Sequence, residues 1–553
     1  MKMTGAQAII KVLQEQGIET VFGYPGGAVI PLYTALYDAP VNNVLTAHEQ
    51  GAIHAADGYA RASGKVGVCI ATSGPGATNI VTGLATAYLD SIPLVAISGQ
   101  VPVANLGRDA FQEIDIVGVT MPITKYNAIV RKSEELVPML RKAFAIAKNG
   151  RPGPVLIDVP SDLQVKELDY PELEEIKLPE VMKADEGIVE KAAAALNGAE
   201  RPVLMVGGGA VTSAVEAELM ELAHKADLPV VSTLMGLGVY PGNDERAIGL
   251  TGMHGHIDCN LAVANADVLI VAGSRLSDRV TGDRNRYAGT KTIIHMDIDP
   301  SELDKNVVVP MHLSGDLKET LAKFLPLVKE SKHPEWWQQI RDWDKMEERF
   351  LPDGSRLTAP WVMTQLNKTF ADRDTIFVTD VGQNQMWAAQ YLTIDKPRHH
   401  LTSGGCGTMG FGLPGAMGAA FAKPDSQIVH ICGDGGFKMT GMEMFTASRE
   451  NLPLISIVIN NSCLGMVRQW QQLFYNERYS ATILTEFDFV GFAKSCGADG
   501  RTVTTCEEFT EALKEAQGRT KPFLIEVRIE QSDLVEPMVA AGAVIYDFVK
   551  THI

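Results

Sequence analysis

The feature that most constrains the fold is a Gly-Asp-Gly turn followed, at a set distance, by a pair of asparagines. An apolar run at residues 428–432 ends at the turn that carries Asp434, and a second apolar run at 454–459 ends just before Asn461. The segment 439–451 between them has a helical pattern, so the stretch predicts two parallel buried strands joined by a helix. Ligands of open α/β sheets bind at the carboxyl ends of the strands. A carboxylate and an amide oxygen at that edge suit Mg²⁺, which also takes phosphate oxygens and water.

Gly433 and Gly435 of this turn allow the backbone to approach a diphosphate closely. The turn, the paired asparagines and the spacing between them resemble the signature of thiamine-diphosphate enzymes. A plain strand–helix–strand unit with no ligand is the competing interpretation, and the remaining motifs decide between them.

Length and composition exclude several other classes of protein. A chain of 553 residues is too long for one core and predicts about three domains. The net charge of −18 and the absence of any Lys/Arg-rich run argue against binding to nucleic acid. No apolar stretch approaches the length of a membrane span, and the first residues form no signal peptide. The seven scattered cysteines are typical of reduced thiols, so we expect a cytoplasmic protein.

The order of apolar runs and glycine turns predicts an α/β protein with three doubly wound parallel-sheet domains. We place an N-terminal domain at residues 1–165, a Rossmann-like central domain at 188–325 and a C-terminal domain at 355–545. Two linkers are expected, one acidic and proline-bearing at about 163–186, the other after residue 325 with Trp336 and Trp337 in a polar helical context. In the first domain, strands are expected at 20–23, 44–49, 66–72, 93–98 and 154–159; in the central domain, at 203–206, 268–272 and 293–299.

Glu49 is the second residue, after the predicted metal ligands, on which the functional prediction depends. Taken alone, it is a carboxylate at the start of a helix, where the helix dipole favours negative charge. The motifs around it, Tyr24-Pro25-Gly26-Gly27, His48-Glu49-Gln50-Gly51 and Ser73-Gly74-Pro75-Gly76, lie in the order found in thiamine-diphosphate decarboxylases and carboligases. In that family a glutamate at this place hydrogen-bonds the aminopyrimidine ring of the cofactor and drives its tautomerisation.

The resemblance narrows to the catalytic large subunit of acetohydroxyacid synthase, also called acetolactate synthase, and covers nearly the whole chain. The motifs that carry it are 109–113 (DAFQE), 124–127 (TKYN), 252–255 (GMHG), 277–282 (SDRVTG), 385–390 (QMWAAQ), 465–471 (GMVRQWQ) and 537–539 (PMV). It implies a transferase of branched-chain amino-acid biosynthesis, which decarboxylates pyruvate and adds the two-carbon unit to a second 2-keto acid. Pyruvate as acceptor gives 2-acetolactate, and 2-ketobutyrate gives 2-aceto-2-hydroxybutyrate.

The same resemblance implies the cofactors and their sites. Thiamine diphosphate would contact Gly382, Gln383, Asn384, Gly407, Met409, Gly435, Gly436 and Met466, and Mg²⁺ would be held by Asp434, Asn461 and the backbone carbonyl of Cys463. FAD, which takes no net part in the reaction, would contact Arg151, Gly208, Thr233, Leu234, Met253, His254, Gly255, Arg279, Asp297, Asp299 and Asp316. The glycine run 207–209 alone is a weak signal for a dinucleotide.

Four residues are expected to act on the substrates. By the resemblance, Gln112 would hydrogen-bond the substrate or cofactor and Phe111 would lie beside it. Arg279 would hold the carboxylate of the acceptor, for which a forked guanidinium is suited. Trp470 would contact the alkyl group of the acceptor.

The family also implies assembly. Active sites are expected between subunits of a homodimer or homotetramer, and the family often pairs with a small regulatory subunit. Two positions depart from the family pattern: Ser161 stands where a lysine is usual, beside the substrate channel, and Asn384 stands where a histidine is usual, beside the diphosphate. Asparagine can still donate a hydrogen bond there.

Three alternatives remain at this point. A flavin-bearing pyruvate oxidase is the nearest, although Trp470 and the context of Gln112 favour the synthase. A non-catalytic relative is disfavoured because Glu49, Asp434 and Asn461 are all present. A nicotinamide dehydrogenase lacks a proper dinucleotide fingerprint.

Overall fold

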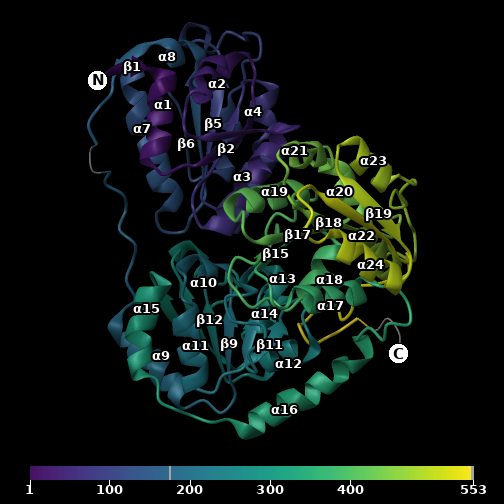
Figure 1. The fold of residues 1–553 in the computed structure, drawn as a ribbon. Helices are drawn as coiled ribbons and strands as arrows, with labels where there is room; N and C mark the ends of the chain where they lie inside the picture. The colour runs from purple at the N-terminus through teal and green to yellow at the C-terminus, as the bar shows by residue number, and fades with distance from the viewer. Residues whose placement is uncertain (174–175, 550–553) are drawn as a thin grey trace.

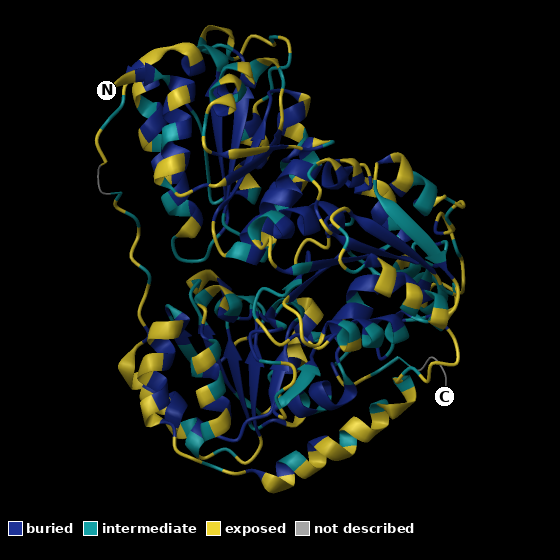
Figure 2. Ribbon diagram, viewed as in Figure 1, coloured by how far each residue is buried: buried dark blue, intermediate teal, exposed yellow. Residues whose placement is uncertain are grey.

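Three six-stranded parallel sheets, one in each domain, form the framework of the molecule (Figure 1). The computed structural model describes residues 1–173 and 176–549. The strand orders are β3-β2-β4-β5-β7-β6, β11-β10-β9-β12-β13-β14 and β16-β15-β17-β18-β20-β19. Central strands are buried along most of their length and helices cover both faces of each sheet (Figure 2), which confirms the predicted doubly wound α/β class.

The N-terminal domain builds its sheet from apolar strands and from helices that are capped at sequence-visible positions. Thr4, for example, caps α1 in a reciprocal pair with Gln7. The strands are β2 (Thr20–Tyr24), β3 (Asn42–Leu45), β4 (Gly67–Ala71), β5 (Leu94–Gln100), β6 (Tyr126–Ile129) and β7 (Pro154–Pro160), with a separate antiparallel pair β1 (Lys2–Thr4) and β8 (Glu167–Asp169). The helices are α1 (Gly5–Glu15), α2 (Ile30–Tyr37), α3 (Glu49–Ser63), α4 (Pro75–Asn79), α5 (Val81–Asp90), α6 (Ile116–Thr120), α7 (Ser133–Lys148) and α8 (Ser161–Val165).

The central domain repeats the α/β pattern with shorter strands. The strands are β9 (Pro202–Val206), β10 (Val230–Ser232), β11 (Ala247–Leu250), β12 (Val268–Ala272), β13 (Thr292–Asp297) and β14 (Met311–Ser314). The helices are α9 (Glu186–Asn197), α10 (Gly208–Ser213), α11 (Glu216–Lys225), α12 (Ile257–Asn265), α13 (Asp278–Thr281), α14 (Arg284–Tyr287), α15 (Leu317–Phe324) and α16 (Pro334–Asp344).

The C-terminal domain contains the stretch that constrains the fold most. Its strands are β15 (Thr375–Thr379), β16 (His400–Leu401), β17 (Gln427–Gly433), β18 (Ile455–Asn460), β19 (Asp499–Val503) and β20 (Phe523–Arg528). Its helices are α17 (Ala359–Phe370), α18 (Gln383–Tyr391), α19 (Gly412–Ala422), α20 (Asp434–Thr440), α21 (Glu443–Arg449), α22 (Gly465–Phe474), α23 (Phe489–Ser495) and α24 (Cys506–Ala516). β17 and β18 pair in parallel, as the spacing predicted.

The N- and C-terminal domains pack against each other through α3 and α19 (Figure 1). Both helices consist largely of Gly and Ala, so their backbones approach closely. A Cβ at Gly58 would overlap the backbone of Gly415, and one at Gly418 would overlap the carbonyl of Ala55. The absence of side chains at these glycines is therefore a condition of the interdomain contact.

Two element predictions near the site were wrong. The strand expected at 44–49 ends at Leu45, and Glu49 begins α3 because the side chain of His48 accepts a hydrogen bond from Gln50 N and caps the helix. The helix expected at 439–451 is instead two helices, α20 and α21. The first begins at Asp434, where a negative charge favours a helix N-terminus, and it ends at Thr440.

Both expected linkers contain packed structure. Leu163 and Leu168 join the core of the N-terminal domain, so the first linker packs at its start. The second linker contains α16, whose Trp336 is buried against the central domain and donates its indole N–H to the carbonyl of Pro202. The outer face of α16 is exposed (Figure 2). No helix in the described part of the chain is both long and apolar enough to cross a membrane.

Candidate active site

Asp434 and Asn461 lie at the carboxyl ends of the neighbouring strands β17 and β18. Asn461 donates its amide N–H to Gln383 Oε1 at 2.9 Å, which leaves its carbonyl oxygen available. Asp434 Oδ1 accepts from Gly435 N at 2.8 Å, whereas Oδ2 is buried with no partner among the described residues. Burial raises the pKa of Asp434 to about 6. A buried oxygen without a donor beside a free amide oxygen fits a hard cation such as Mg²⁺.

Cys463 lies two residues after Asn461, in the turn that follows β18. Leu464 N donates to the carbonyl of Thr482 and Leu484 N to that of Ser462, so two backbone hydrogen bonds fix the turn. Burial raises the pKa of the Cys463 thiol to about 11, so the sulfur stays protonated at neutral pH. The backbone carbonyl, not the sulfur, is therefore the group of this residue that suits a hard cation.

The glycines after Asp434 lie where neighbouring atoms leave no room for a side chain. A Cβ at Gly435 would lie 2.6 Å from Leu464 Cδ2 and 3.5 Å from Met409 Cε, and one at Gly436 would overlap Asp380 Oδ1. Met409 thus packs beside the turn that carries the predicted metal ligand. The two glycines allow this turn to pack tightly against its neighbours, and we refer to the turn as the predicted diphosphate cradle.

Asp380, which the sequence analysis missed, organises this cradle. The buried carboxylate follows β15 and accepts hydrogen bonds from Val381 N at 2.8 Å, from Gly410 N at 3.0 and 3.1 Å and from Gly412 N at 3.0 Å. Burial raises its pKa above the usual range for a carboxyl. The sequence did contain a signal for Asp380, because it follows an apolar strand. Asp434 had been located by that rule, that polar residues at the carboxyl ends of parallel strands lie at the ligand site.

The start of α18 completes this half of the site. Gly382 adopts a positive φ of 126°, which favours glycine, and Gln383 links Asn461 to the carbonyl of Asp533. Asn384, at the position of the usual histidine, has its Nδ2 3.4 Å from the carbonyl of Val381, and its Oδ1 is buried without a partner in the described chain. An unpaired buried amide oxygen is the kind of group that a bound ligand satisfies.

Glu49 lies in the N-terminal domain with a second group of predicted residues. Its Oε2 accepts from Asn79 Nδ2 at 2.9 Å, and a Cβ at Gly76 would lie 3.1 Å from its Oε1. Gln112 packs on the other side of the same glycine loop, since a Cβ at Gly74 would lie 2.8 Å from Gln112 Cβ. Phe111 is 87% exposed on this surface.

The two groups lie on different domains, and these domains touch close to Glu49, where Ala47 N and His48 N donate to Glu443 Oε1 at 3.1 and 3.2 Å. No hydrogen bond in the described residues joins Glu49 or Gln112 to Asp434 or Asn461. Glu49 and Gln112 are also absent from the cleft that lies between the domains. Glu49 and Gln112 thus form one group of side chains, and Asp434 and Asn461 form another on a different domain.

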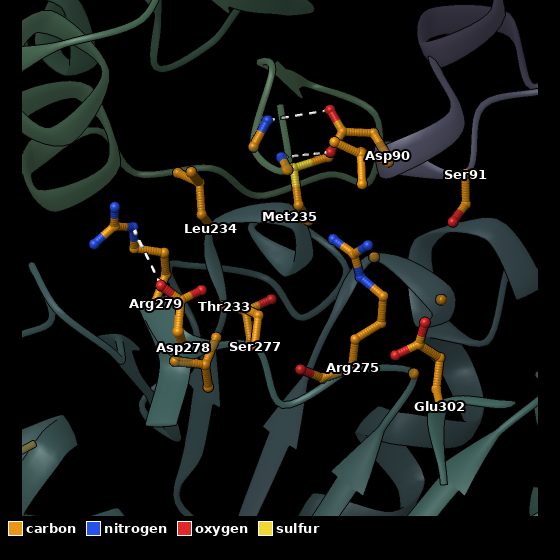
Figure 3. Close-up of a pocket in the computed structure, with 18 of the residues that line it drawn as sticks. Asp90, Ser91, Thr233, Leu234, Met235, Arg275, Ser277, Asp278, Arg279 and Glu302 are labelled. Atoms are coloured by element: carbon orange, nitrogen blue, oxygen red, sulfur yellow. Dashed lines mark hydrogen bonds and ion pairs between the residues drawn. The ribbon is translucent and has the colours of Figure 1, made fainter. Parts of the chain in front are cut away.

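A cleft of about 700 Å³ runs between the three domains (Figure 3). Its lining includes the predicted flavin residues Arg151, Gly208, Thr233, Leu234, Met253, His254, Arg279 and Asp297, and the predicted thiamine or substrate residues Gly382, Gly407, Met466 and Trp470. Met466 and Trp470 are one turn apart on α22. The cleft is therefore continuous from the central domain to the edge of the diphosphate cradle.

Three predicted flavin residues do not line this cleft: Gly255, Asp299 and Asp316. Asp316 caps α15 through Glu319 N, and Asp299 lies 3.1 Å from Arg151 Nη1. Glu302, which the sequence analysis missed, lines the cleft and lies 2.7 Å from the same Arg151 nitrogen. Glu302 is buried, and no sequence signal distinguished it from the other acidic residues of the chain.

Arg279 points its guanidinium into the cleft with few constraints. The side chain is 59% exposed, its ion pair with Asp278 is long at 3.9 Å, and Nη1 lies 3.3 Å from Met253 Sδ. Figure 3 shows Arg279 and Asp278 at the same end of the cleft. A cation with no close acidic partner can bind a ligand anion.

Comparison with known proteins identifies the family. Models of the N-terminal, central and C-terminal domains of thiamine pyrophosphate enzymes match residues 3–119, 189–324 and 380–527, the first and last described as TPP-binding. A probable acetolactate synthase large subunit of Methanocaldococcus jannaschii is 45% identical over 556 residues, covering 98% of this chain and 94% of that protein. The chain belongs to the acetolactate synthase large-subunit family.

Two bacterial relatives extend the match. The acetolactate synthase isozyme 2 large subunit of Escherichia coli is 44% identical over 551 residues, covering 98% of both chains. The acetolactate synthase large subunit of Haemophilus influenzae is 39% identical over 562 residues, covering 99% of this chain and 98% of its own. Membership of the acetolactate synthase family confirms a thiamine-diphosphate-dependent transferase of branched-chain amino-acid biosynthesis, and it disfavours the pyruvate oxidase alternative.

Proposed function

We propose that the protein condenses pyruvate with a second 2-keto acid, either pyruvate or 2-ketobutyrate, in a site that holds thiamine diphosphate, Mg²⁺ and FAD. The observation that carries the proposal is the continuous cleft in which Arg279 and Trp470 share one lining with the predicted flavin residues. Bound thiamine diphosphate supplies the electron sink for decarboxylation and carbon–carbon bond formation.

The metal and diphosphate would be held by the C-terminal domain. Asp434, Asn461 and the carbonyl of Cys463 would ligate Mg²⁺, and the backbone at Gly435 would face the phosphates. The unpaired Asp434 Oδ2 supports this assignment. FAD would occupy the central part of the cleft, where Arg151 is already neutralised by Asp299 and Glu302.

The acceptor would be held by two side chains of different character. The guanidinium of Arg279 would bind the carboxylate that all 2-keto acids share. Trp470 would contact the alkyl group, which is the part that differs between acceptors. Specificity would then depend on apolar contact, not on charge.

Glu49 and Gln112 would reach the cofactor of a second copy of the chain. Glu49 and the predicted metal ligands lie on different domains with no hydrogen bond between them in the described chain, so we propose that a homodimer, or a homotetramer of such dimers, completes each site. The carboxylate of Glu49, held by Asn79, would hold or move a proton on the pyrimidine ring of the cofactor.

We infer three further features of the protein in its cell. The relatives are called large subunits, so a small regulatory subunit is a proposed partner. The free cysteines of the described chain fit a reducing compartment, and we assign the protein to the cytoplasm. The domains are taken as 1–165, 188–325 and 355–545.

Product analysis tests the proposal. Purified protein is incubated with pyruvate, with and without 2-ketobutyrate, and each of the three cofactors is omitted in turn. Acetohydroxyacids should form only with thiamine diphosphate and a divalent cation, and flavin should stay oxidised under anaerobic conditions. Bleaching of the flavin by pyruvate at the catalytic rate would instead support an oxidase.

A further inference from the structure

The end of α5 contacts a loop of another domain at the edge of the cleft. Asp90, the last residue of α5, accepts hydrogen bonds from Gly404 N at 3.1 Å and from Gly405 N at 2.6 Å, as the dashed lines in Figure 3 show. Asp90 and both glycines line the cleft, together with Cys406 and Gly407. Gly407 is predicted to contact thiamine diphosphate, so Asp90 holds the loop that leads to the cofactor.

Asp90 is itself fixed by a buried cation. Arg61 donates to Asp90 Oδ2 at 2.8 Å and to the carbonyl of Thr402 at 2.7 Å, and it also pairs with Asp57. The side chains of Asp57 and Asp90 are fully buried, and that of Arg61 is 4% exposed. Burial of a charge is costly unless it is paired, so this cluster keeps one geometry.

Asp57 and Arg61 lie on α3, the helix that begins at Glu49. The cluster therefore links α3, the end of α5 and the glycine loop of the C-terminal domain within one chain.

Ser91, the residue after Asp90, connects the end of α5 to the central domain through Arg151. Ser91 Oγ accepts from Arg151 Nε at 2.8 Å, and Arg151 pairs with Asp299 and Glu302. Arg151 is a predicted flavin contact. The two residues at the end of α5 thus touch a predicted flavin residue on one side and the thiamine loop on the other.

Met235 of the central domain packs against the glycine loop on the side opposite to α5. A Cβ at Gly404 would overlap Met235 Sδ, and one at Gly405 would lie 2.8 Å from Asp90 Oδ1 and 3.0 Å from Leu89 Cβ. The glycine loop therefore packs between α5 and Met235, and a side chain at either glycine would displace one of them.

We propose that Asp90 is a positioning residue that fixes the Gly404–Gly407 loop where it lines the cleft between the flavin and thiamine sites. The inference rests on the proposed function for the identity of the two cofactors. Asp90 touches neither cofactor itself; it acts through the two glycine amides. Loss of its carboxylate should loosen the loop and weaken the binding of both cofactors.

The test replaces Asp90 with asparagine, which keeps the shape but offers one acceptor oxygen for three donors. A hydrogen bond to a charged group typically contributes ~1.5–3 kcal/mol, so the Kd for FAD, measured by quenching of flavin fluorescence on the full-length protein, should rise by about 10-fold or more. The apparent Kd for thiamine diphosphate should rise as well. Hydrogen exchange at residues 404–407 should accelerate in the variant.

Asp38→Asn is the matched control, because Asp38 is an exposed aspartate at a helix end of the same domain, outside the Arg61 cluster. Its Kd values should stay within about 2-fold of the parent. Equal cofactor affinity and equal exchange in Asp90→Asn and the parent would overturn the inference, as would equal losses in the two variants. If Asp90→Asn does not fold, Gly405→Ala disturbs the same contact from the loop, and unchanged affinity there overturns the inference too.

Cofactor binding by the parent protein shows whether a negative result refutes the role of Asp90 or the proposed function. Failure of the parent to bind FAD or thiamine diphosphate would refute the proposed cofactors. Normal binding in the parent, with no change in the Asp90 variant, would refute only the role of Asp90.

Discussion

Replacement of Glu49 by glutamine should reduce turnover strongly and leave cofactor binding nearly intact. Glu49 is 8% exposed and accepts one hydrogen bond, from Asn79. A glutamine oxygen can accept the same bond, so the variant keeps the local packing but loses the charge and the ability to take up a proton. Positioned proton transfer typically contributes ~10²–10⁴-fold to rate. We therefore expect kcat to fall by about that factor.

The predicted diphosphate and metal ligands lie on another domain, so the Kd for thiamine diphosphate should change by no more than about 3-fold, roughly 0.6 kcal/mol. Both quantities are measured on the purified variant, kcat by acetohydroxyacid formation and Kd by titration of intrinsic fluorescence. Glu19→Gln, an exposed carboxylate of the same domain, is the control for surface charge. A Glu49→Gln enzyme with near-parental kcat would refute the catalytic assignment.

Four further predictions follow from the same geometry. Trp470→Leu should still form acetolactate but lose most of its preference for 2-ketobutyrate in direct competition, because one methylene in an apolar pocket contributes ~1–3 kcal/mol; an unchanged product ratio would place the acceptor pocket elsewhere. Mixed dimers of Glu49→Gln and Asp434→Ala chains should recover part of the activity through hybrid sites, whereas inactive mixed dimers would contradict a shared site. Burial raises the pKa of Asp158 to about 7, so the protonated carboxyl stabilises the fold fully below about pH 4, and this stabilisation is lost as the pH rises to 7. The Tm of Asp158→Asn relative to the parent should therefore increase from pH 5 to pH 8. A Tm difference that stays constant with pH would exclude a titration of Asp158 in this range. Cys406, an exposed thiol on the cleft, should be alkylated first among the cysteines, and FAD with thiamine diphosphate should slow this reaction; equal rates with and without cofactors would contradict their proposed position.

The residues at the ends of parallel strands could be predicted from the sequence because their signal is local. Two apolar runs, the first ending at a glycine turn and the second at paired asparagines, located β17 and β18, and with them Asp434 and Asn461. The element boundaries were less predictable. The strand expected to reach Glu49 ends at Leu45, since a histidine side chain takes the capping role that sequence rules assign to Ser, Thr, Asp or Asn.

The interdomain contacts could not be predicted. Asp90 and Arg61 are ordinary helix residues in the sequence, and only the fold brings them together with Gly404 and Gly405 of another domain. Glu302 is similar, because its partner Arg151 is far away in the chain. Pairings of this kind depend on how domains pack, for which no periodicity or motif gives a signal.

Product identification from ¹³C-labelled pyruvate tests the central claim most directly. Purified protein with thiamine diphosphate, Mg²⁺ and FAD is given labelled pyruvate alone, and the products are identified by NMR. The proposed function predicts 2-acetolactate and carbon dioxide in equal amounts, with two pyruvates consumed for each. Acetate or acetyl phosphate as the main product, or no consumption of pyruvate by protein that binds all three cofactors, would contradict it.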